Sequence, residues 1–420
     1  MADTDSGTSQ GRRYKVVFKN RDDFQAARAL EIGPIALPVE NERRLFFSVA
    51  SSPESVRAAD RGRTPDLVLD EYLESFVKHY DANVVEDYQF ELEAASTIFC
   101  LDAISSPDEK EPSLWNVLDV IEASAAWEQS RGDDVVIAIV DTGIDGRRPE
   151  FPESKRAGSW QPLDEQPWTD WNGHGTMCAC IAAASDAEEG EFSGVAPGAR
   201  LMACKTWFYD TELTTIYDTL ADRALEGETI VASNSFGLRT GTPPPPPEES
   251  DFPDALAGAL EAGVHVVFSA GNNHDLTGGE PEDCAPNSIW LHKCRADVLT
   301  VATCDLEGSM WYYSSRGPGQ FVGEPGMREK PDVTAPTPRN GRVLYGDQVR
   351  ALAEGWGTSG ACPQVAGLAA LLLSRQPALP RETLIRLIHE SATTLGFDPH
   401  CEGRGMINCR AAMDGLLVAS

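Results

Sequence analysis

The sequence predicts an α/β fold built on a mostly parallel β-sheet with helices on both faces, preceded by a small α+β unit. From residue 114 onward, short continuous apolar runs alternate with helical segments, which is typical of buried parallel strands joined by helices. Residues 13–95 show a different order of elements. The 420 residues, 41% of them hydrophobic, suffice for a large core and more than one domain.

The N-terminal part divides into three segments. Residues 1–12 are polar and predict a disordered tail, residues 13–95 predict the small unit, and residues 96–112 carry the Ser and Pro residues of an exposed linker. The small unit has expected strands at 14–18, 35–37, 45–49 and 83–88 and expected helices at 21–32 and 66–80. This β-α-β-β-α-β order is ferredoxin-like.

The large domain is expected to span residues 113–420. Its apolar runs predict five strands, at 134–140, 199–205, 229–233, 264–270 and 298–302. Helical segments lie between them, near 213–226 and 252–262. In such folds the active groups gather at the C-terminal ends of the strands.

The charge and composition of the chain argue against several functional classes of protein. The net charge of −31 and the lack of a basic patch argue against nucleic acid as a partner. No apolar run is long enough to span a membrane, and the polar N-terminus is not a secretory signal, so we expect a cytoplasmic protein.

The expected location bears on the state of the cysteines. In a cytoplasmic protein the ten cysteines should mostly be reduced, although Cys284/Cys294 and Cys401/Cys409 could pair in an oxidising compartment. No C-x-x-C motif indicates zinc, and no metal site is predicted.

The stretch 356–367 predicts a glycine turn, a hydroxyl and then a buried helix. Ser359 is expected at the helix N-terminus, where free N–H groups favour a developing anion. Pro363 is expected in the first helical turn, where its missing N–H costs nothing. Ser359 is therefore a candidate nucleophile, although a serine at this place is more often only a helix cap.

Three further polar residues follow predicted strands or open helices, each beside glycine. They are Asp141, His174 and Asn272. Taken singly, they could be a turn aspartate, a loop histidine and an asparagine turn. Together with Ser359 they form a set in one α/β domain, and their order, Asp then His then Ser, differs from that of α/β-hydrolases and chymotrypsin-like enzymes.

The three blocks at 141–143, 174–176 and 357–359 resemble the catalytic blocks of the subtilisin-like serine peptidases, or subtilases. The resemblance covers residues 113–418, with further landmarks at 194–197, 331–336 and 405–408. Residues 13–95 resemble the family's pro-domain more weakly. The chain departs from the family pattern at Met177, Gly360 and Gln364, none of which performs bond chemistry.

The resemblance implies a mechanism. Ser359 would be the nucleophile, His174 its general base and Asp141 the residue that orients the imidazole. The Asn272 amide and the Ser359 N–H would bind the oxyanion. Cys178 falls where one branch of the family has a cysteine under the catalytic histidine, which implies sensitivity to thiol-binding mercurials.

The resemblance also implies where a peptide or protein substrate would bind. It should add a strand to the block at residues 233–237. The substrate-binding residues would be Ser233, Ser235, Phe236 and Gly237 on one wall of the specificity pocket and Ala270 and Gly271 on the other. The pocket could be apolar or could carry a carboxylate that selects basic residues. The run of prolines within 241–250 should border this cleft.

We therefore expect an intracellular processing endopeptidase made as a zymogen. Its pro-domain would act as an intramolecular inhibitor, and self-cleavage would fall within 96–112. Structural calcium is possible from the family resemblance, but no dense carboxylate loop supports it. One alternative is a catalytically silent peptide-binding protein of the same fold. A nucleotide-binding protein is disfavoured because a carboxylate, Asp141, follows the first strand where pyrophosphate would lie.

Overall fold

The computed structural model describes residues 13–28, 35–36, 38–51, 65–92, 111–163, 165–185, 192–237, 250–278, 280, 283–285, 287–319 and 328–419. The predicted tail (1–12), and most of the predicted linker (96–112) and of the proline loop (241–250), lie outside the described residues.

The N-terminal unit is a small antiparallel sheet with two helices. Its elements are β1 (Arg13–Phe18), α1 (Arg21–Arg28), β2 (Ile35–Ala36), β3 (Glu40–Asn41), β4 (Phe46–Ser51), α3 (Pro65–His79) and β5 (Ala82–Glu86). The strands lie in the order β2-β4-β1-β5, and β3 also pairs with β4. The predicted β-α-β-β-α-β order is confirmed, with the extra short β3.

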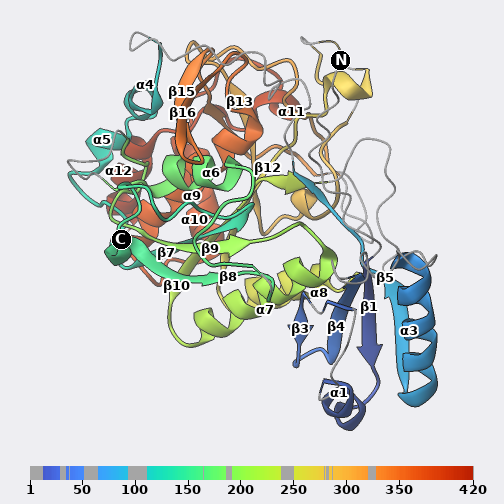
Figure 1. The fold of residues 1–420 in the computed structure, drawn as a ribbon. Coiled ribbons are helices and arrows are strands. Elements are labelled where there is room, and N and C mark those ends of the chain that lie inside the picture. The colour runs from blue at the N-terminus through green and yellow to red at the C-terminus, as the bar shows by residue number, and fades with distance from the viewer. Residues whose placement is uncertain are drawn as a thin grey trace.

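A seven-stranded parallel sheet forms the centre of the large domain (Figure 1). Its order is β14-β13-β12-β10-β7-β9-β8. In chain order the strands are β7 (Val135–Asp141), β8 (Arg156–Trp160), β9 (Arg200–Lys205), β10 (Thr229–Asn234), β12 (His265–Ser269), β13 (Leu299–Cys304) and β14 (Val333–Pro336). The five predicted strands are present. The two edge strands, β8 and β14, were not predicted, because they are short and carry no long apolar run.

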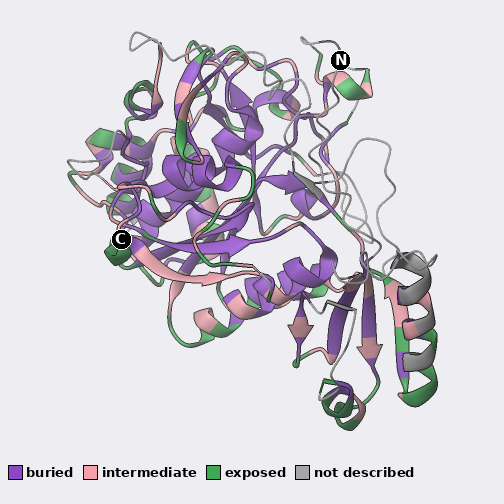
Figure 2. Cartoon of the chain, viewed as in Figure 1, coloured by how far each residue is buried: buried purple, intermediate pink, exposed green. Residues whose placement is uncertain are grey.

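Helices cover both faces of this sheet, as predicted. The helix α6 (His174–Ala183) and the long α9 (Gly357–Arg375) pack on one face, and α7 (Asp210–Leu225) and α8 (Phe252–Glu261) on the other. Alternate residues of β7 therefore belong to different cores: Ile137 packs with α6 and α9, and Ala138 with α7 and α8. Figure 2 shows β7, α6 and α9 as almost entirely buried.

The remaining elements pack on the side of the sheet that α9 covers or lie at the periphery of the large domain. They are α4 (Leu114–Val120), α5 (Ala123–Ala126), the antiparallel hairpin β15 (Gly341–Tyr345) and β16 (Gln348–Leu352), α10 (Arg381–Ser391), α11 (Pro399–Glu402) and α12 (Cys409–Ala419). Among the helices of the described residues, none is both long and apolar enough to cross a bilayer.

The N-terminal unit lies against α7 and α8 (Figure 1). After β5, the chain runs beside residues 207–210: the Phe90 N–H donates to the Phe208 carbonyl over 2.8 Å. It then forms β6 (Glu91–Leu92), which pairs antiparallel with β11 (Phe236–Gly237). The block expected to receive a substrate strand therefore carries a strand of this chain.

One disulfide joins Cys284 to Cys401, with Cα atoms 5.4 Å apart. The pairs considered from the sequence, Cys284/Cys294 and Cys401/Cys409, are wrong, because Cys294 and Cys409 are buried free thiols in the core. Sequence spacing pointed to near neighbours, whereas the fold brings together two cysteines separated by 117 positions.

Candidate active site

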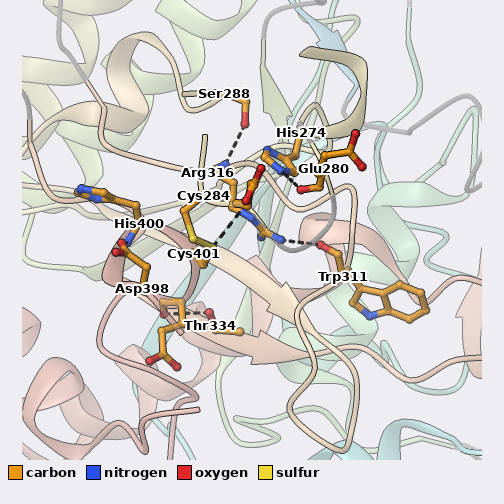
Figure 3. The surroundings of a disulfide bond; sticks show 12 residues. His274, Glu280, Cys284, Ser288, Trp311, Arg316, Thr334, Asp398, His400 and Cys401 are labelled. Carbon is orange, nitrogen blue, oxygen red and sulfur yellow. Dashed lines mark hydrogen bonds between the residues drawn. A yellow bond between two sulfur atoms is a disulfide. The ribbon is translucent and has the colours of Figure 1, made fainter. Parts of the chain in front are cut away.

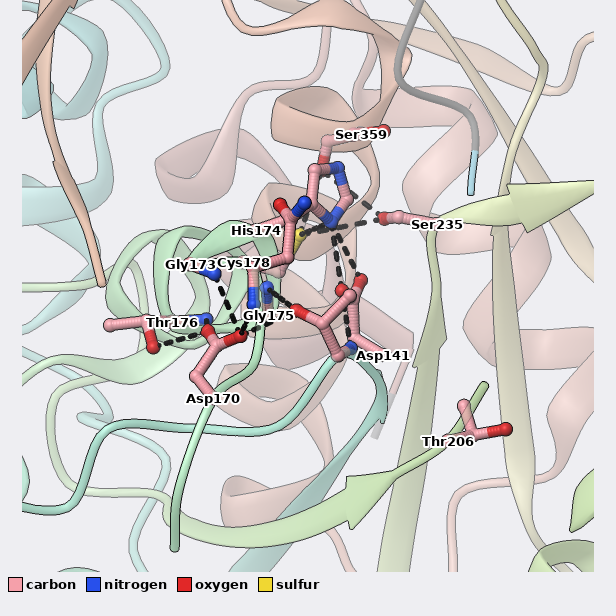
Figure 4. A network of polar contacts seen from close by, with 12 residues as sticks. Asp141, Asp170, Gly173, His174, Gly175, Thr176, Cys178, Thr206, Ser235 and Ser359 are labelled. Atoms are coloured by element: carbon pink, nitrogen blue, oxygen red, sulfur yellow. Dashed lines mark hydrogen bonds and ion pairs between the residues drawn. The ribbon is translucent and has the colours of Figure 1, made fainter. Parts of the chain in front are cut away.

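Asp141 and His174 form a buried pair at the C-terminal end of β7 (Figure 4). Asp141 is the last residue of β7, and His174 is the first residue of α6. The imidazole Nδ1 lies 2.8 Å from Asp141 Oδ1 and 3.0 Å from Oδ2. The Thr142 N–H donates to the same Oδ1 over 2.7 Å, which fixes the carboxylate. This contact defines the tautomer with a proton on Nδ1 and leaves Nε2 as the basic nitrogen.

A second carboxylate, Asp170, holds the start of α6. Its Oδ1 accepts hydrogen bonds from Thr142 Oγ1 and the Gly173 N–H, and its Oδ2 accepts from Thr176 N–H and Oγ1. These bonds satisfy donors at the helix N-terminus and place a negative charge at the positive end of its dipole. Asp170 thus connects the strand that carries Asp141 to the helix that carries His174. Asp170 was not predicted from the sequence, because it lies three residues before the helix N-cap, Gly173, where no local capping rule marks it.

Ser359 lies near the start of α9, fully buried. Its Oγ has no hydrogen-bond partner among the described residues. The placement of Pro363 in the first helical turn is wrong, since α9 begins at Gly357 and Pro363 lies inside it. Pro363 has no N–H to donate to the carbonyl four residues earlier, which is that of Ser359. This carbonyl instead accepts from Ser235 Oγ over 3.2 Å.

Cys178 lies between the imidazole and the serine. Its Sγ is 3.8 Å from His174 Nδ1 and 3.5 Å from the Ser359 carbonyl oxygen. Burial raises the pKa of the Cys178 thiol well above its ordinary value, and the Asp141 carboxylate raises it further. The thiol is therefore a protonated, neutral contact. The His174 imidazole and the Ser359 backbone carbonyl both contact this one sulfur atom, so the structure places the two residues near each other, as Figure 4 shows. Ser359 Oγ and His174 Nε2 do not form a hydrogen bond with each other in this structure.

Asn272 follows β12 and faces the start of α9. Its Oδ1 accepts from the Thr358 N–H over 2.9 Å and from Thr358 Oγ1 over 3.0 Å. These two bonds orient the side-chain amide with its oxygen toward Thr358, so that its NH₂ forms the opposite end. A Cβ added at Gly357, whose φ is +66°, would lie 3.1 Å from Nδ2, so the glycine turn permits this close approach.

The predicted pocket residues separate into two groups. Gly237 and Ala270, from opposite predicted walls, line one cavity together with Lys293. The Gly271 N–H donates to Thr358 Oγ1, so this residue supports the serine turn. Ser233 is different, because its side chain is buried against Cys362, with Oγ 3.5 Å from Sγ. Among the described residues, those that line this cavity include Lys293 and no carboxylate.

The disulfide braces the segment that supplies part of this cavity (Figure 3). Cys284 lies between Asn272 and the cavity residue Ser288, and Cys401 lies in α11. Ser288 Oγ accepts from the Arg316 N–H over 2.8 Å, and the Arg316 guanidinium donates to the Trp311 carbonyl. Burial lowers the pKa of Arg316 to about 10. A covalent bond and a buried arginine therefore anchor this side of the cavity.

One group in the described residues has the spacing to hold a metal ion, and it is Asp141, His174 and Cys178. This set offers sulfur and nitrogen as well as oxygen, whereas Ca²⁺ takes six to eight oxygen ligands. Asp145, the carboxylate nearest to the first catalytic block, is bound by the Arg147 guanidinium through both oxygens. In the described residues, then, no cluster of three or more carboxylates has the spacing of a calcium site.

The fold and this geometry define a class: parallel α/β proteins with an aspartate–histidine pair beside a serine at one edge of the sheet. The profile of the subtilase family matches residues 132–405, which is more than half of the chain. The chain therefore belongs to the subtilase family, a family of serine endopeptidases.

Named relatives agree with this assignment. A calcium-dependent protease of a Nostoc species is 28% identical over 70% of this chain and 48% of its own length. Fervidolysin of Fervidobacterium pennivorans is 29% identical over 74% of this chain and 45% of its own. The chain thus spans about half the length of these relatives.

A crystal structure of MycP1 from the ESX-1 type VII secretion system is similar in fold. It matches with a TM-score of 0.54 and 21% identity, covering 78% of this chain and 90% of that one. At this identity the likeness supports the fold alone.

Proposed function

We propose that this chain hydrolyses peptide bonds through Ser359, His174 and Asp141. A serine hydroxyl is a weak nucleophile at neutral pH and needs an adjacent base. His174 would take the Ser359 proton on Nε2 and pass it to the leaving amine, while Asp141 stabilises the imidazolium. The observation that carries the proposal is the 2.8 Å contact between His174 Nδ1 and Asp141, with the Ser359 backbone carbonyl 3.5 Å from the same Cys178 sulfur that contacts His174.

The oxyanion would be bound by the Asn272 amide and the Ser359 N–H. Both lie beside the start of α9, where the helix dipole also favours negative charge. The Asn272 amide is oriented before substrate binds, because Thr358 holds its oxygen. Such preorganised donors stabilise the transition state without reorganising during the reaction.

Residues 13–95 would act as an intramolecular inhibitor, so the protein would be made as a zymogen. The support is the pairing of β6 with β11. A peptide substrate binding to the same block by β-augmentation would compete with β6 for the same backbone hydrogen bonds. Removal of this segment would open the site to other chains.

A fluorophosphonate probe tests the assignment directly, because it bonds covalently to an activated serine. We expect the matured protein to label at Ser359 and the Ser359→Ala variant to lose both labelling and peptide hydrolysis. Asp170→Asn serves as a comparison, since it should weaken labelling by loosening the start of α6 without removing a reacting group. A wild-type protein that is folded yet neither labels nor cleaves peptides would establish the silent peptide-binding alternative instead.

Calcium dependence and the cytoplasmic location stay predictions. The name of one relative indicates calcium dependence for that protein. A chelator titration followed by thermal unfolding would test it here. The Cys284–Cys401 bond bears on location, because disulfides persist in oxidising compartments. Thiol trapping of these two cysteines in intact cells would decide between a reducing and an oxidising compartment.

A further inference from the structure

We propose that Tyr345, at the tip of the hairpin formed by β15 and β16, is a positioning residue for catalysis. Its side chain holds the loop before His174 at a fixed place relative to the serine turn, which follows the same hairpin in the chain. This inference rests on the proposed function. It adds to that function a residue that acts through the backbone before His174 rather than on the reacting atoms.

The tip of the hairpin packs on the residue that precedes the histidine. Gly173 is the N-cap of α6, with a φ of +101°. A Cβ added at Gly173 would lie 2.6 Å from Cδ1 of the Tyr345 ring and 2.9 Å from the Gly346 nitrogen. The ring and the turn after it therefore lie directly against the backbone of Gly173, and Figure 1 shows the hairpin beside α6. Only glycine permits both this φ and this close approach.

Two hydrogen bonds join the tip to the loop. The Tyr345 hydroxyl donates to Asn172 Oδ1 over 2.6 Å, and the Gly346 N–H donates to the Gly173 carbonyl over 3.2 Å. The same carbonyl accepts a helical hydrogen bond from the Met177 N–H in the first turn of α6. The hairpin thus binds a side-chain oxygen and a backbone oxygen in the two residues before His174.

Asp170 binds the remaining polar groups of this loop. Its Oδ1 accepts from the Asn172 N–H over 3.0 Å and from the Gly173 N–H over 2.7 Å. The carboxylate therefore binds the donors of the loop, whereas the hairpin binds its acceptors. Asp170 joins the loop to the end of β7, which carries Asp141. Tyr345 joins the same loop to a different part of the fold, so the two contacts fix the histidine against different elements.

The hairpin is also bonded to the serine turn at its open end. Its two strands are paired along their whole length. The indole N–H of Trp356 donates to the Gly341 carbonyl over 2.9 Å. Trp356 is fully buried and lies three residues before Ser359. One continuous antiparallel ladder therefore connects the segment before the serine to the loop before the histidine.

The Tyr345 side chain has little freedom of its own. Tyr345 is 5% exposed, and the Arg350 guanidinium lies over its ring, 4.5 Å from the centroid. Burial raises the pKa of the Tyr345 hydroxyl, and the charge of Asp170 raises it further. The hydroxyl therefore stays protonated and donates to Asn172 at every pH near neutrality.

The chemistry gives this brace its importance. Ser359 Oγ and His174 Nε2 are not hydrogen-bonded to each other in this structure, so proton transfer depends on how the two backbones are placed. A displacement of about 1 Å between reacting groups can cost on the order of 100-fold in rate. A contact that fixes the two backbones should therefore act on the chemical step and leave peptide binding unchanged.

The first test is Tyr345→Phe, which removes the hydroxyl and keeps the ring. With a fluorogenic peptide that the matured wild-type protein cleaves, kcat should fall about 2- to 10-fold, the range for one neutral hydrogen bond. KM should stay within about 2-fold. The rate of fluorophosphonate labelling should fall by the same factor as kcat, because it needs the serine and its base but no bound peptide. Tyr345→Ala, which also removes the ring, should cost about 100-fold in kcat.

A double-mutant cycle assigns the effect to one contact. Asn172→Ala alone should lower kcat about as much as Tyr345→Phe does. The double variant should be no slower than the slower of the two single variants, because both remove the same hydrogen bond. Losses in kcat that add in the double variant would exclude this contact as the cause.

The matched control is Tyr312→Phe. It removes a hydroxyl that donates to Glu354 over 2.6 Å, outside the hairpin and outside the loop before His174. It should lower the melting temperature about as much as Tyr345→Phe does and leave kcat unchanged. A wild-type kcat and labelling rate in Tyr345→Phe, or an equal fall in Tyr312→Phe, would overturn the inference and leave the proposed function intact. A folded wild-type protein that neither labels nor cleaves would overturn the proposed function, and this inference with it.

Discussion

Two groups of buried charged side chains in the described chain differ in an instructive way. The active-site group consists of Asp141 and His174 beside Ser359. The interface group joins Arg13, Lys15 and Asp87 of the N-terminal unit to Asp210 and Glu212 of α7. Both groups are almost inaccessible to solvent. They differ in how completely their polar atoms are bonded.

The interface group is richly paired. Arg13 contacts Asp87 at 2.9 Å and Glu212 at 2.7 Å, and Asp87 also accepts from the Thr211 N–H and Oγ1. Lys15 bonds to Asp210, and to Asp251 over 2.8 Å. In the active-site group, by contrast, the described residues offer Ser359 Oγ no hydrogen bond. A satisfied buried network holds two parts together, whereas an unsatisfied buried hydroxyl costs stability and is kept for chemistry.

Ser359→Ala should have the largest effect: it should remove catalytic activity without lowering thermal stability. We expect a loss in kcat on the order of 10⁶-fold, the loss measured for the nucleophile of the relative subtilisin. The melting temperature should stay equal or rise, because the substitution removes a buried hydroxyl that has no partner. Thermal unfolding and peptide hydrolysis on the same sample check both parts. A clear drop in melting temperature would mean that this hydroxyl has a structural role, and the contrast between the two groups would fail.

Arg13→Met tests the interface group. It leaves Asp87 and Glu212 without the arginine that offsets their burial, which should cost about 3–5 kcal/mol of docking free energy. Hydrogen exchange in the Ser359→Ala background, where the chain stays uncut, should show faster exchange in β1 and β5. The control is Lys19→Met, which breaks an exposed pair with Asp81 worth at most about 1 kcal/mol. Equal exchange in the two variants would contradict the assigned role of Arg13.

Removing the disulfide should lower the stability of the large domain without weakening the contacts of the interface group. Cys401→Ser opens a cross-link between positions 117 apart and should cost about 2–5 kcal/mol of unfolding free energy. Because Cys284 precedes the pocket residues, KM should rise more than kcat falls. Thermal unfolding and steady-state kinetics measure the two effects. Cys294→Ser, which changes a buried free thiol, is the matched control. An unchanged KM would show that the bond does not brace the pocket.

Lowering the pH should stabilise the docking of the N-terminal unit, by a smaller amount of free energy. Burial raises the pKa of Asp87 from 3.8 to about 6, with Arg13 acting in the opposite direction, and the groups facing it are Tyr209, Asp210 and Glu212. A raised pKa favours the protonated form in the docked state. This contribution is therefore full below about pH 4 and is lost as the pH rises through 6, an effect of about 1–3 kcal/mol. Hydrogen exchange of β5 against pH measures it. Asp87→Asn should flatten the profile, and an unchanged slope would assign the titration to another group.

Much of the architecture was predictable from local patterns. The apolar runs of β7, β10 and β12 marked strands that are buried on both faces, and such runs need no knowledge of their neighbours. The edge strands β8 and β14 were missed, because both are short and neither carries a long apolar run. The start of α9 was also misplaced, since Ser359 was expected at the helix N-terminus and Pro363 in the first turn, whereas the helix begins at Gly357.

By itself the sequence predicted the candidate residues Asp141, His174, Asn272 and Ser359, because each lies within two residues of a glycine at the end of a strand or the start of a helix. Only the tertiary structure decided the partners of these residues. Asp170 and the Cys284–Cys401 pair act through contacts between segments far apart in the chain. Such contacts depend on how the sheet and its loops converge, and no local spacing encodes them.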